Sequence, residues 1–204
     1  MARTGRPRAF DRDDAVDQAM QLFWQHGYDS TSLALLKAQL GGGISAPSFY
    51  AAFGSKEALF DECVQRYLTT FAQVTECLWD EALPPRQAIE TALRQSARMQ
   101  CDDGHPKGCM VTLGVMSAPS PENAGVVEAL THSRARTRAG IRACVERGLR
   151  EGLLAENTNA AAMATVFDSF LQGISILARD DTPLESIDAA ITQVMRTWDV
   201  MAKS

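Results

Sequence analysis

Apolar side chains in this chain recur mostly at intervals of three and four, which is the period of a helix with one buried face. The first such segment spans residues 12–26, and its apolar stripe is Ala15, Ala19, Leu22 and Phe23. Asp11 stands before this segment as a candidate N-cap, and Gly27 follows it as a candidate C-terminal stop. The pattern continues to the C-terminus and predicts an all-α protein with about nine helices.

Residues 31–56 predict two short helices joined by a turn. The first helix directs three leucines to one face: Leu33, Leu36 and Leu40. Three glycines, residues 41–43, then interrupt it, because glycine readily adopts positive φ. Ser45 is the candidate N-cap of the second helix, which ends near Phe53. Two short helices held at an angle form a helix-turn-helix unit, whose second helix enters a major groove of DNA.

The run TSLALLKAQLGGGISAPSFYAAFGSKEALF, with LFWQHGYDSTS upstream, resembles the DNA-binding domain of the TetR family of transcriptional regulators. The family pattern Tyr-x-x-Phe-x-x-Lys-Glu-x-Leu is matched by Tyr50, Phe53, Lys56, Glu57 and Leu59. The turn departs from the pattern, since Gly42-Gly43 looks like a two-residue insertion that would tilt or loosen the recognition helix. The resemblance implies a helix-turn-helix three-helix domain at residues 1–62, followed by an α-helical ligand-binding and dimerisation domain at residues 63–204.

Candidate DNA contacts come first from the chain terminus and from the start of the helix-turn-helix. Arg3, Arg6 and Arg8 form a basic arm that would lie along phosphates or in the minor groove; the alternative is a solvated tail. Thr31 is the candidate N-cap of the first short helix. A helix N-terminus offers free N–H groups to an anion, so Thr31 or Ser32 would also contact a phosphate.

The first turn of the second short helix holds the candidate base-reading side chains: Ser45, Ala46, Pro47 and Ser48. Serine can bond base edges, and alanine and proline can pack against a thymine methyl group. The resemblance implies phosphate contacts for Tyr50 and Lys56, although Tyr50 could instead pack against the first helix. Without an arginine or asparagine in this turn, part of the specificity would come from DNA shape.

The charge distribution is compatible with DNA binding at one end. The net charge is −5, but residues 1–56 carry six Lys/Arg against five Asp/Glu, whereas the remainder carries 14 against 20. An acidic body with a locally positive end suits a protein that touches DNA with one face. The basic stretch from Arg134 to Arg142 is interpreted as a solvated or ion-paired face.

The remaining periodic segments predict the helices of the body: 56–78, 86–99, 109–116, 122–151, 159–178 and one that starts near 183. We expect them to enclose a pocket for a small-molecule inducer, as the resemblance implies; plain core is the alternative for its large side chains. These candidates are Tyr67, Phe71, Trp79, Met99, Cys109, Met110, Met116, Phe167 and Phe170.

Cys109 is the sharpest of these candidates. It follows His105, Lys107 and Gly108 at the predicted start of a helix, where a helix N-terminus and a nearby cation would lower a thiol pKa. The residue would then sense an electrophile or an oxidant, as the resemblance also implies; a small buried core residue is the alternative. With five cysteines and no C-x-x-C, we expect no disulfide framework, metal site or cofactor.

The last two helices are amphipathic and predict a homodimer formed as a four-helix bundle, as in the TetR family. Their candidate interface residues are Phe170, Ile174, Ile187, Ile191, Val194 and Trp198. An intrachain hairpin of a monomer is the alternative.

The function we expect is a dimeric regulator, a repressor released from a palindromic operator by a small or electrophilic inducer. Enzyme signatures such as H-E-x-x-H, G-x-S-x-G or a P-loop are absent. No apolar run of about 18 residues suggests a membrane span, and the N-terminus lacks the apolar core of a secretory signal, so we expect a cytoplasmic protein. The alternative is a helical interaction protein whose operator binding is weakened by the Gly42-Gly43 insertion.

Overall fold

The computed structural model describes residues 10–115 and 120–203, and these are helical apart from turns, loops and one isolated bridge between Leu154 and Ala202. The α-helices are α1 (Arg12–His26), α2 (Leu33–Gln39), α3 (Ala46–Phe53), α4 (Lys56–Thr69), α5 (Pro85–Gln100), α6 (Met110–Leu113), α7 (Glu128–Arg150), α8 (Ala160–Arg179) and α9 (Leu184–Asp199). Three 3-10 helices join them: η1 (Leu40–Gly42), η2 (Phe71–Trp79) and η3 (Pro121–Val127).

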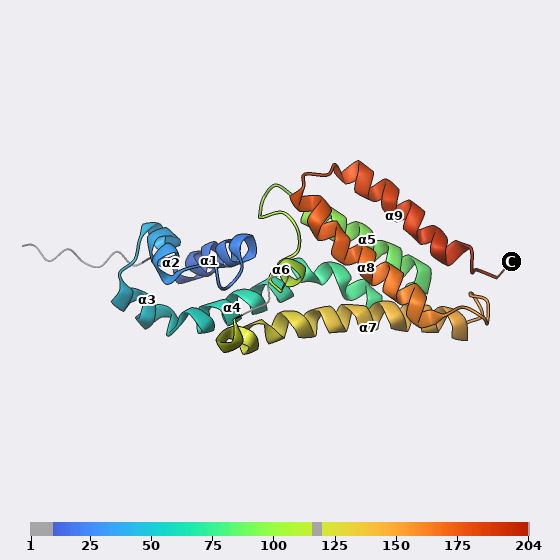
Figure 1. Ribbon diagram of the computed structural model, residues 1–204, viewed down its shortest axis with the longest axis horizontal. Helices are drawn as coiled ribbons and strands as arrows, with labels where there is room; N and C mark the ends of the chain where they lie inside the picture. Colours follow the sequence, from blue (N-terminus) through green and yellow to red (C-terminus); the bar gives the residue numbers. More distant parts are fainter. Residues whose placement is uncertain (1–9, 116–119, 204) are drawn as a thin grey trace, which may run out of the picture.

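The molecule is elongated, with α1, α2 and α3 at one end and α5, α7, α8 and α9 at the other (Figure 1). α4 and η2 run in sequence from the first group into the second, beside α7. The expected all-α architecture, with an N-terminal helix-turn-helix and a helical body, is therefore confirmed.

Local sequence explains where the first helices begin. The Asp11 carboxylate accepts hydrogen bonds from the N–H groups of Asp13 and Asp14, and so caps α1. The Ser45 hydroxyl accepts from the Ser48 N–H and caps α3. Gly27 ends α1 with φ 79°. The predictions for the two caps and for this stop are confirmed.

The predicted single helix over residues 56–78 is wrong. α4 ends at Thr69, Thr70 adopts φ −122° and ψ −86°, and the next nine residues form η2. The hydroxyls of Thr69 and Thr70 both donate to the Arg66 carbonyl oxygen, at 3.1 and 2.7 Å. Such side-chain bonds compete with the backbone ladder and favour a break. Apolar periodicity could not reveal it, because Phe71, Val74 and Leu78 keep the spacings of three and four that are typical of an α-helix.

Two further helix boundaries differ from the prediction. The helix expected at 109–116 is reduced to the four residues of α6, and Met116 lies outside the described residues. The long helix expected from Glu122 is divided into η3 and α7, which begins only at Glu128. The proline at position 121 is compatible with a first turn, but nothing in the sequence signalled a switch from 3-10 to α geometry.

The buried side chains form two clusters. The first joins α1, α2, α3 and α4 and includes Met110 and Val111 of α6 and Leu130 of α7. The second joins α5, α7, α8 and α9 around Phe167 and Trp198. The boundary expected between residues 62 and 63 therefore falls inside a continuous core, since Cys63, Val64 and Tyr67 all belong to the first cluster.

α8 is long and apolar enough, by length and composition alone, to cross a membrane, unlike what the sequence pattern suggested. In this fold one of its faces is buried against α5, α7 and α9, with Phe167, Ile174 and Ser175 fully enclosed. One face of the helix thus belongs to the second buried cluster.

Candidate nucleic-acid interface and body pocket

α3 presents its first turn outward and anchors its second. Ser45, Pro47 and Ser48 are exposed, and Ala46 is partly so, whereas Phe49 and Phe53 are buried in the first cluster. The hydroxyls of Ser45 and Ser48 lie 2.9 Å apart, so they share one hydrogen bond. This turn can therefore offer hydroxyl groups and small apolar groups to a base edge.

The glycine turn before α3 is ordered by its own hydrogen bonds. Gly41, Gly42 and Gly43 all have positive φ, at 57°, 75° and 106°. The Ile44 N–H donates to the Lys37 carbonyl oxygen at 2.8 Å, and the Gly41 N–H donates to the Gln18 side chain at 3.0 Å. The lengthened turn is thus tied to both α1 and α2, which argues against a loosened α3.

The start of α2 differs from the expectation. Ser32, not Thr31, is the N-cap, and its hydroxyl accepts from the Leu35 N–H at 3.1 Å. Thr31 is fully buried, and its hydroxyl donates to the Gly27 carbonyl oxygen at 2.7 Å. The N-cap role expected of Thr31 is therefore wrong, because its hydroxyl is enclosed and already bonded. Ser32 is exposed at the same helix end.

Tyr50 and Lys56 are placed differently from each other. Tyr50 is 51% exposed, and its ring meets Phe49 edge-on rather than packing against α1. The Lys56 ammonium lies 4.1 Å from the centre of the Tyr28 ring, and its partial burial lowers its pKa. Arg3, Arg6 and Arg8 lie outside the described residues.

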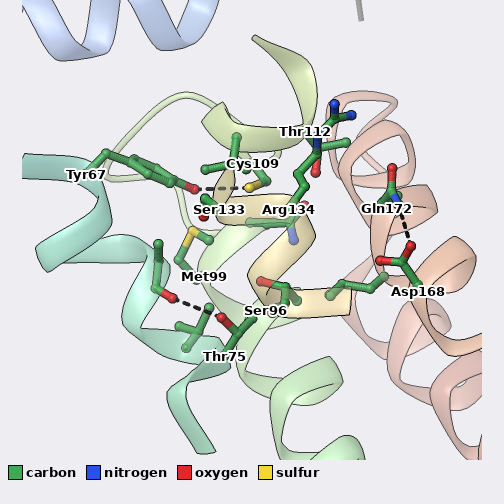
Figure 2. A pocket seen from close by; sticks show the side chains of 16 residues that line it. Tyr67, Thr75, Ser96, Met99, Cys109, Thr112, Ser133, Arg134, Asp168 and Gln172 are labelled. Carbon is green, nitrogen blue, oxygen red and sulfur yellow. Dashed lines mark hydrogen bonds between the residues drawn. The ribbon is translucent and has the colours of Figure 1, made fainter. Parts of the chain in front are cut away.

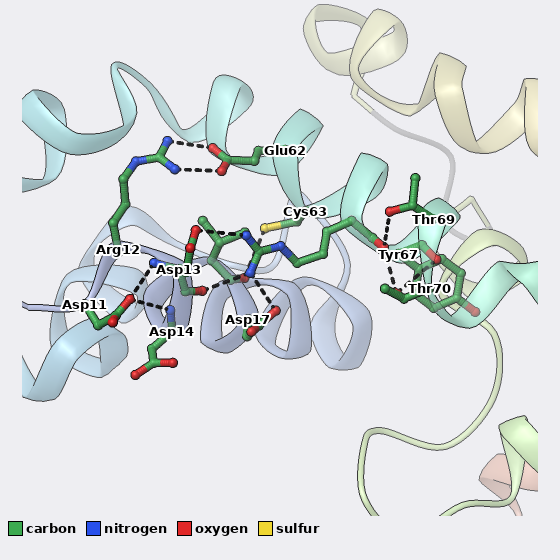
Figure 3. Close-up of polar contacts among 12 residues, drawn as sticks. Asp11, Arg12, Asp13, Asp14, Asp17, Glu62, Cys63, Tyr67, Thr69 and Thr70 are labelled. Carbon is green, nitrogen blue, oxygen red and sulfur yellow. Dashed lines mark hydrogen bonds and ion pairs between the residues drawn. The ribbon is translucent and has the colours of Figure 1, made fainter.

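An ion-pair network, which the sequence analysis missed, fixes α1 against α4 (Figure 3). Arg12 makes a two-pronged contact with Glu62, both at 2.7 Å, and donates to the Ala52 carbonyl oxygen at the end of α3. Arg66 bridges Asp13 and Asp17 of α1 at 3.2 and 3.0 Å. The Arg12 guanidinium holds the pKa of Glu62 below its usual value. Charges about 50 positions apart carry no spacing signal, so only the fold could pair them.

The body contains a small pocket between α4, η2, α5, α6, α7 and α8 (Figure 2). Three of the predicted residues, Tyr67, Met99 and Cys109, line it, and its volume is about 50 Å³. The Tyr67 hydroxyl donates to the Cys109 sulfur at 3.3 Å. The polar residues that line the pocket include Thr75, Ser96, Thr112, Ser133, Arg134, Asp168 and Gln172.

The other predicted pocket residues lie elsewhere. Met110 and Phe167 are buried in the two core clusters, and Phe170 packs at the edge of the second. Phe71 stacks against Tyr67 and meets Trp24 and His105 edge-on. Trp79 is 42% exposed. Apolar spacing identified side chains that turn inward, but it could not distinguish a core position from a pocket wall.

The surroundings of Cys109 also differ from the expectation. It is the N-cap residue of a four-residue helix, without a capping hydrogen bond from its side chain. The Lys107 ammonium is held by the Cys101 carbonyl oxygen and the Asp103 carboxylate. The His105 ring stacks on Trp24. The polar partner of this thiol is therefore the Tyr67 hydroxyl, and the pKa of Tyr67 is raised by its burial.

The loop before Cys109 is tied to the DNA-binding end. The Trp24 indole of α1 donates to the Gly108 carbonyl oxygen at 3.1 Å. Arg179, at the end of α8, donates to the carbonyl oxygens of Trp24 and Gln25 at 2.9 and 3.3 Å. These contacts connect the loop before Cys109 and the end of α8 to α1, and no sequence pattern indicated them.

Most of the residues predicted for a dimer interface face the interior of their own chain. Ile174, Ile187, Ile191 and Trp198 are at most 3% exposed, so they cannot contact a partner as predicted. Phe170 and Val194 are partly buried. The apolar side chains that α8 presents outward are instead Val166 and Ile176, at 42% and 40% exposure.

Comparison with known proteins agrees with this architecture. Residues 15–63 match the model of the bacterial regulatory proteins of the tetR family. The chain is 31% identical over 200 residues to the HTH-type transcriptional repressor ComR of Escherichia coli, covering 98% of this chain and 94% of that protein. It is 37% identical over 113 residues to the repressor BdcR of the same organism, covering 55% of this chain and 56% of that protein.

A solved structure shares the whole arrangement. It is a cysteine mutant of the regulator CifR in complex with 26-base-pair double-strand operator DNA. It superimposes with a TM-score of 0.82 at 37% identity and covers 95% of this chain and 100% of that chain.

Proposed function

This chain belongs to the TetR family of bacterial transcriptional regulators, and from that premise we propose that it is a homodimeric repressor, released from a palindromic operator by a small inducer. Like its relatives, which are transcriptional regulators, it is a DNA-binding regulator and not an enzyme. The observation that carries the proposal is the outward first turn of α3, held between a hydrogen-bonded glycine turn and two buried phenylalanines. We place its action in the cytoplasm, where bacterial DNA lies.

The proposed DNA contacts follow from exposure and chemistry. Ser45, Ala46, Pro47 and Ser48 face the base edges, while Ser32, Tyr50 and Lys56 contact phosphates on either side. Arg3, Arg6 and Arg8 extend this surface along the backbone or into the minor groove. Since α3 offers no bidentate side chain to a base, a single copy would bind weakly, and two copies on an inverted repeat restore affinity.

In the proposed dimer, α8 of one copy packs against α8 of the second copy. Val166 and Ile176 are large apolar side chains of α8 that remain exposed, Ile176 at the edge of a groove beside α1, α6 and η3. Exposed large apolar side chains favour an interface. A two-fold axis beside α8 would pair these residues with their counterparts. Ile176→Asp should therefore dissociate the dimer in sedimentation experiments, whereas Val200→Asp, at an equally apolar but remote exposed site, should leave it intact.

The proposed inducer acts through the body pocket. Cys109 offers a nucleophilic sulfur beside the Tyr67 hydroxyl, so a small electrophile would bond to the sulfur while the thiol proton is released. A reversible ligand in the same pocket would act without that bond. In either case, occupancy shifts the population toward a conformer whose recognition helices no longer match successive grooves.

The deciding experiment selects binders from a randomised DNA pool, with the full chain and with a triple Arg3, Arg6 and Arg8 to alanine variant. An enriched inverted repeat, bound more weakly by the variant, is the expected result. Enrichment of a single half-site would contradict the dimer. Uniform, salt-sensitive binding without enrichment would favour the second candidate, a helical interaction protein that has lost operator recognition.

A further inference from the structure

The pocket wall is chemically divided. Met99, Val111 and Leu171 supply an apolar side, and Thr112, Ser133 and Arg134 supply hydroxyl groups and a guanidinium. In the view of Figure 2, Arg134 rises from α7 between Cys109 and Gln172. A pocket of this kind suits a small molecule with one apolar end and one polar end.

Arg134 differs from the other arginines in the middle of α7. Arg136 pairs with Glu76, Arg138 with Asp168 at 3.2 Å, and Arg142 with Glu146 at 2.7 Å. Among the described side chains, from which those of residues 121, 122 and 124 are excluded, Arg134 forms no ion pair. Its Nε is buried and, within the described residues, has no hydrogen-bond partner. A buried donor without an acceptor is costly, and so it points to an acceptor supplied from outside the chain.

The one acid in the pocket does not meet that need. Asp168 also lines the pocket, but its Oδ2 is taken up by Arg138 at 3.2 Å and by the Gln172 amide at 3.0 Å. The Asp168–Arg138 pair is neutral as a unit, so no acid among the described pocket residues compensates the positive charge of the Arg134 guanidinium. The pocket therefore favours a ligand with a single negative charge.

We propose that the body pocket binds a short-chain monocarboxylate, with its carboxylate on Arg134 and its alkyl end against Met99, Val111 and Leu171. A planar carboxylate matches the fork of a guanidinium, which favours it over a single-point acceptor. The volume of about 50 Å³ leaves room for only a few non-hydrogen atoms, because in the same measure a single water needs about 10–15 Å³. This inference deepens the proposed inducer site and rests on that function.

The test measures binding by calorimetry of acetate, propionate and butyrate to the full-length protein, with propionamide as the neutral analogue of propionate. We expect at least one acid to bind and propionamide to bind at least about tenfold more weakly, the loss expected for one charge-assisted contact. Absence of binding by all three acids, or equal binding of propionate and propionamide, overturns the inference.

Substitutions at Arg134 test whether the carboxylate of the ligand binds to this residue. Arg134→Gln should weaken binding by at least about tenfold, whereas Arg142→Gln, which alters an exposed arginine paired within the same helix, should leave it unchanged. Arg134→Lys keeps the charge without the fork and should give an intermediate loss. Unchanged binding by Arg134→Gln, in a protein whose helical content is intact, would locate the acid elsewhere.

Failure of this inference can be separated from failure of the proposed function. Operator selection from the DNA pool does not depend on the acid. An enriched operator together with no carboxylate binding leaves the regulator proposal standing and removes only the ligand class. Carboxylate binding without any enriched operator removes the operator proposal instead.

Discussion

The indole N–H of Trp24 donates to the carbonyl oxygen of Gly108 at 3.1 Å, within a buried contact that joins α1 to the residue preceding Cys109. Trp24 also meets Tyr67 and Phe71 edge-on, at ring separations of 4.8 and 5.1 Å. Trp24 therefore joins α1 to the loop before Cys109 by a hydrogen bond, and to α4 and η2 by ring contacts.

Trp24→Phe should lower the free energy of unfolding by about 1–3 kcal/mol, because it leaves the Gly108 carbonyl oxygen buried without its donor. Urea denaturation followed by circular dichroism measures the change. Trp79→Phe is the matched control, since Trp79 is 42% exposed and its loss should cost far less. Equal costs for the two variants would show that the Trp24 hydrogen bond contributes nothing.

Gly41 and Gly42 allow a paired test of the turn before α3. Both have positive φ, so alanine at either costs about 1–2 kcal/mol from backbone strain alone. At Gly41 the new Cβ would also lie 2.6 Å from the Phe10 Cβ, whereas at Gly42 nothing lies within 4 Å. Gly41→Ala should thus lose more unfolding free energy than Gly42→Ala, by about 1 kcal/mol or more.

Operator binding adds a second readout to this pair. In the sequence Phe10 follows the segment that holds Arg3, Arg6 and Arg8, so we expect its displacement to affect the proposed DNA contacts of these arginines as well as the turn. Gly41→Ala should then weaken operator affinity more than Gly42→Ala, in filter-binding titrations at a temperature where both variants are folded. The reverse order would mean that the turn acts on α3 alone.

Lys56→Gln should make operator binding less sensitive to salt. Each lysine that neutralises a phosphate contributes about 0.9 to the slope of log affinity against log salt concentration, so a dimer should lose about 2. Arg142→Gln removes an equal charge far from α3 and should leave the slope unchanged. A slope unaltered by Lys56→Gln would remove this lysine from the DNA surface.

Cys144 predicts a loss of stability in alkaline solution. Burial raises its pKa to about 11, above the value of about 8.5 for an unfolded thiol. The contribution of the protonated Cys144 thiol to the free energy of unfolding is fully present below the pKa of the unfolded thiol. As the pH rises toward 11, the unfolded chain releases the proton first, so the free energy of unfolding falls.

Urea denaturation at pH 8 and pH 10.5 tests this, and Cys144→Ala should show a smaller fall than the native sequence. Val145→Ala truncates the neighbouring buried residue and should lower stability at both pH values without changing the difference. An undiminished fall in Cys144→Ala would assign the alkaline loss to other groups.

Local signals predicted the helix ends that depend on one side chain. Asp11 and Ser45 cap helices where the sequence placed them, because the capping oxygen and the N–H groups that donate to it lie within three residues. Thr31 and Ser32 show where local signals fail, because from the sequence either hydroxyl could cap α2. Ser32 is the cap in the structure, and the Thr31 hydroxyl is buried and donates to the Gly27 carbonyl oxygen.

Side-chain roles that depend on distant elements could not be predicted. Ile191 and Trp198 have the spacing of an interface, but α5 and α8 cover that face within the same chain. Phe167 has the size of a pocket residue and fills a core. The sequence could not distinguish Arg134 from its neighbouring arginines, since only the fold shows which of them form ion pairs with acidic residues.

The 3-10 geometry of η2 makes the segment between α4 and the body longer than an α-helix of the same number of residues. Its nine residues rise about 2.0 Å each, against about 1.5 Å in an α-helix, so η2 is about 4–5 Å longer than the same residues would be as α-helix. Three of those residues, Ala72, Val74 and Thr75, line the pocket. Winding η2 as an α-helix would therefore shorten the connection between α4 and the body by nearly one helical turn.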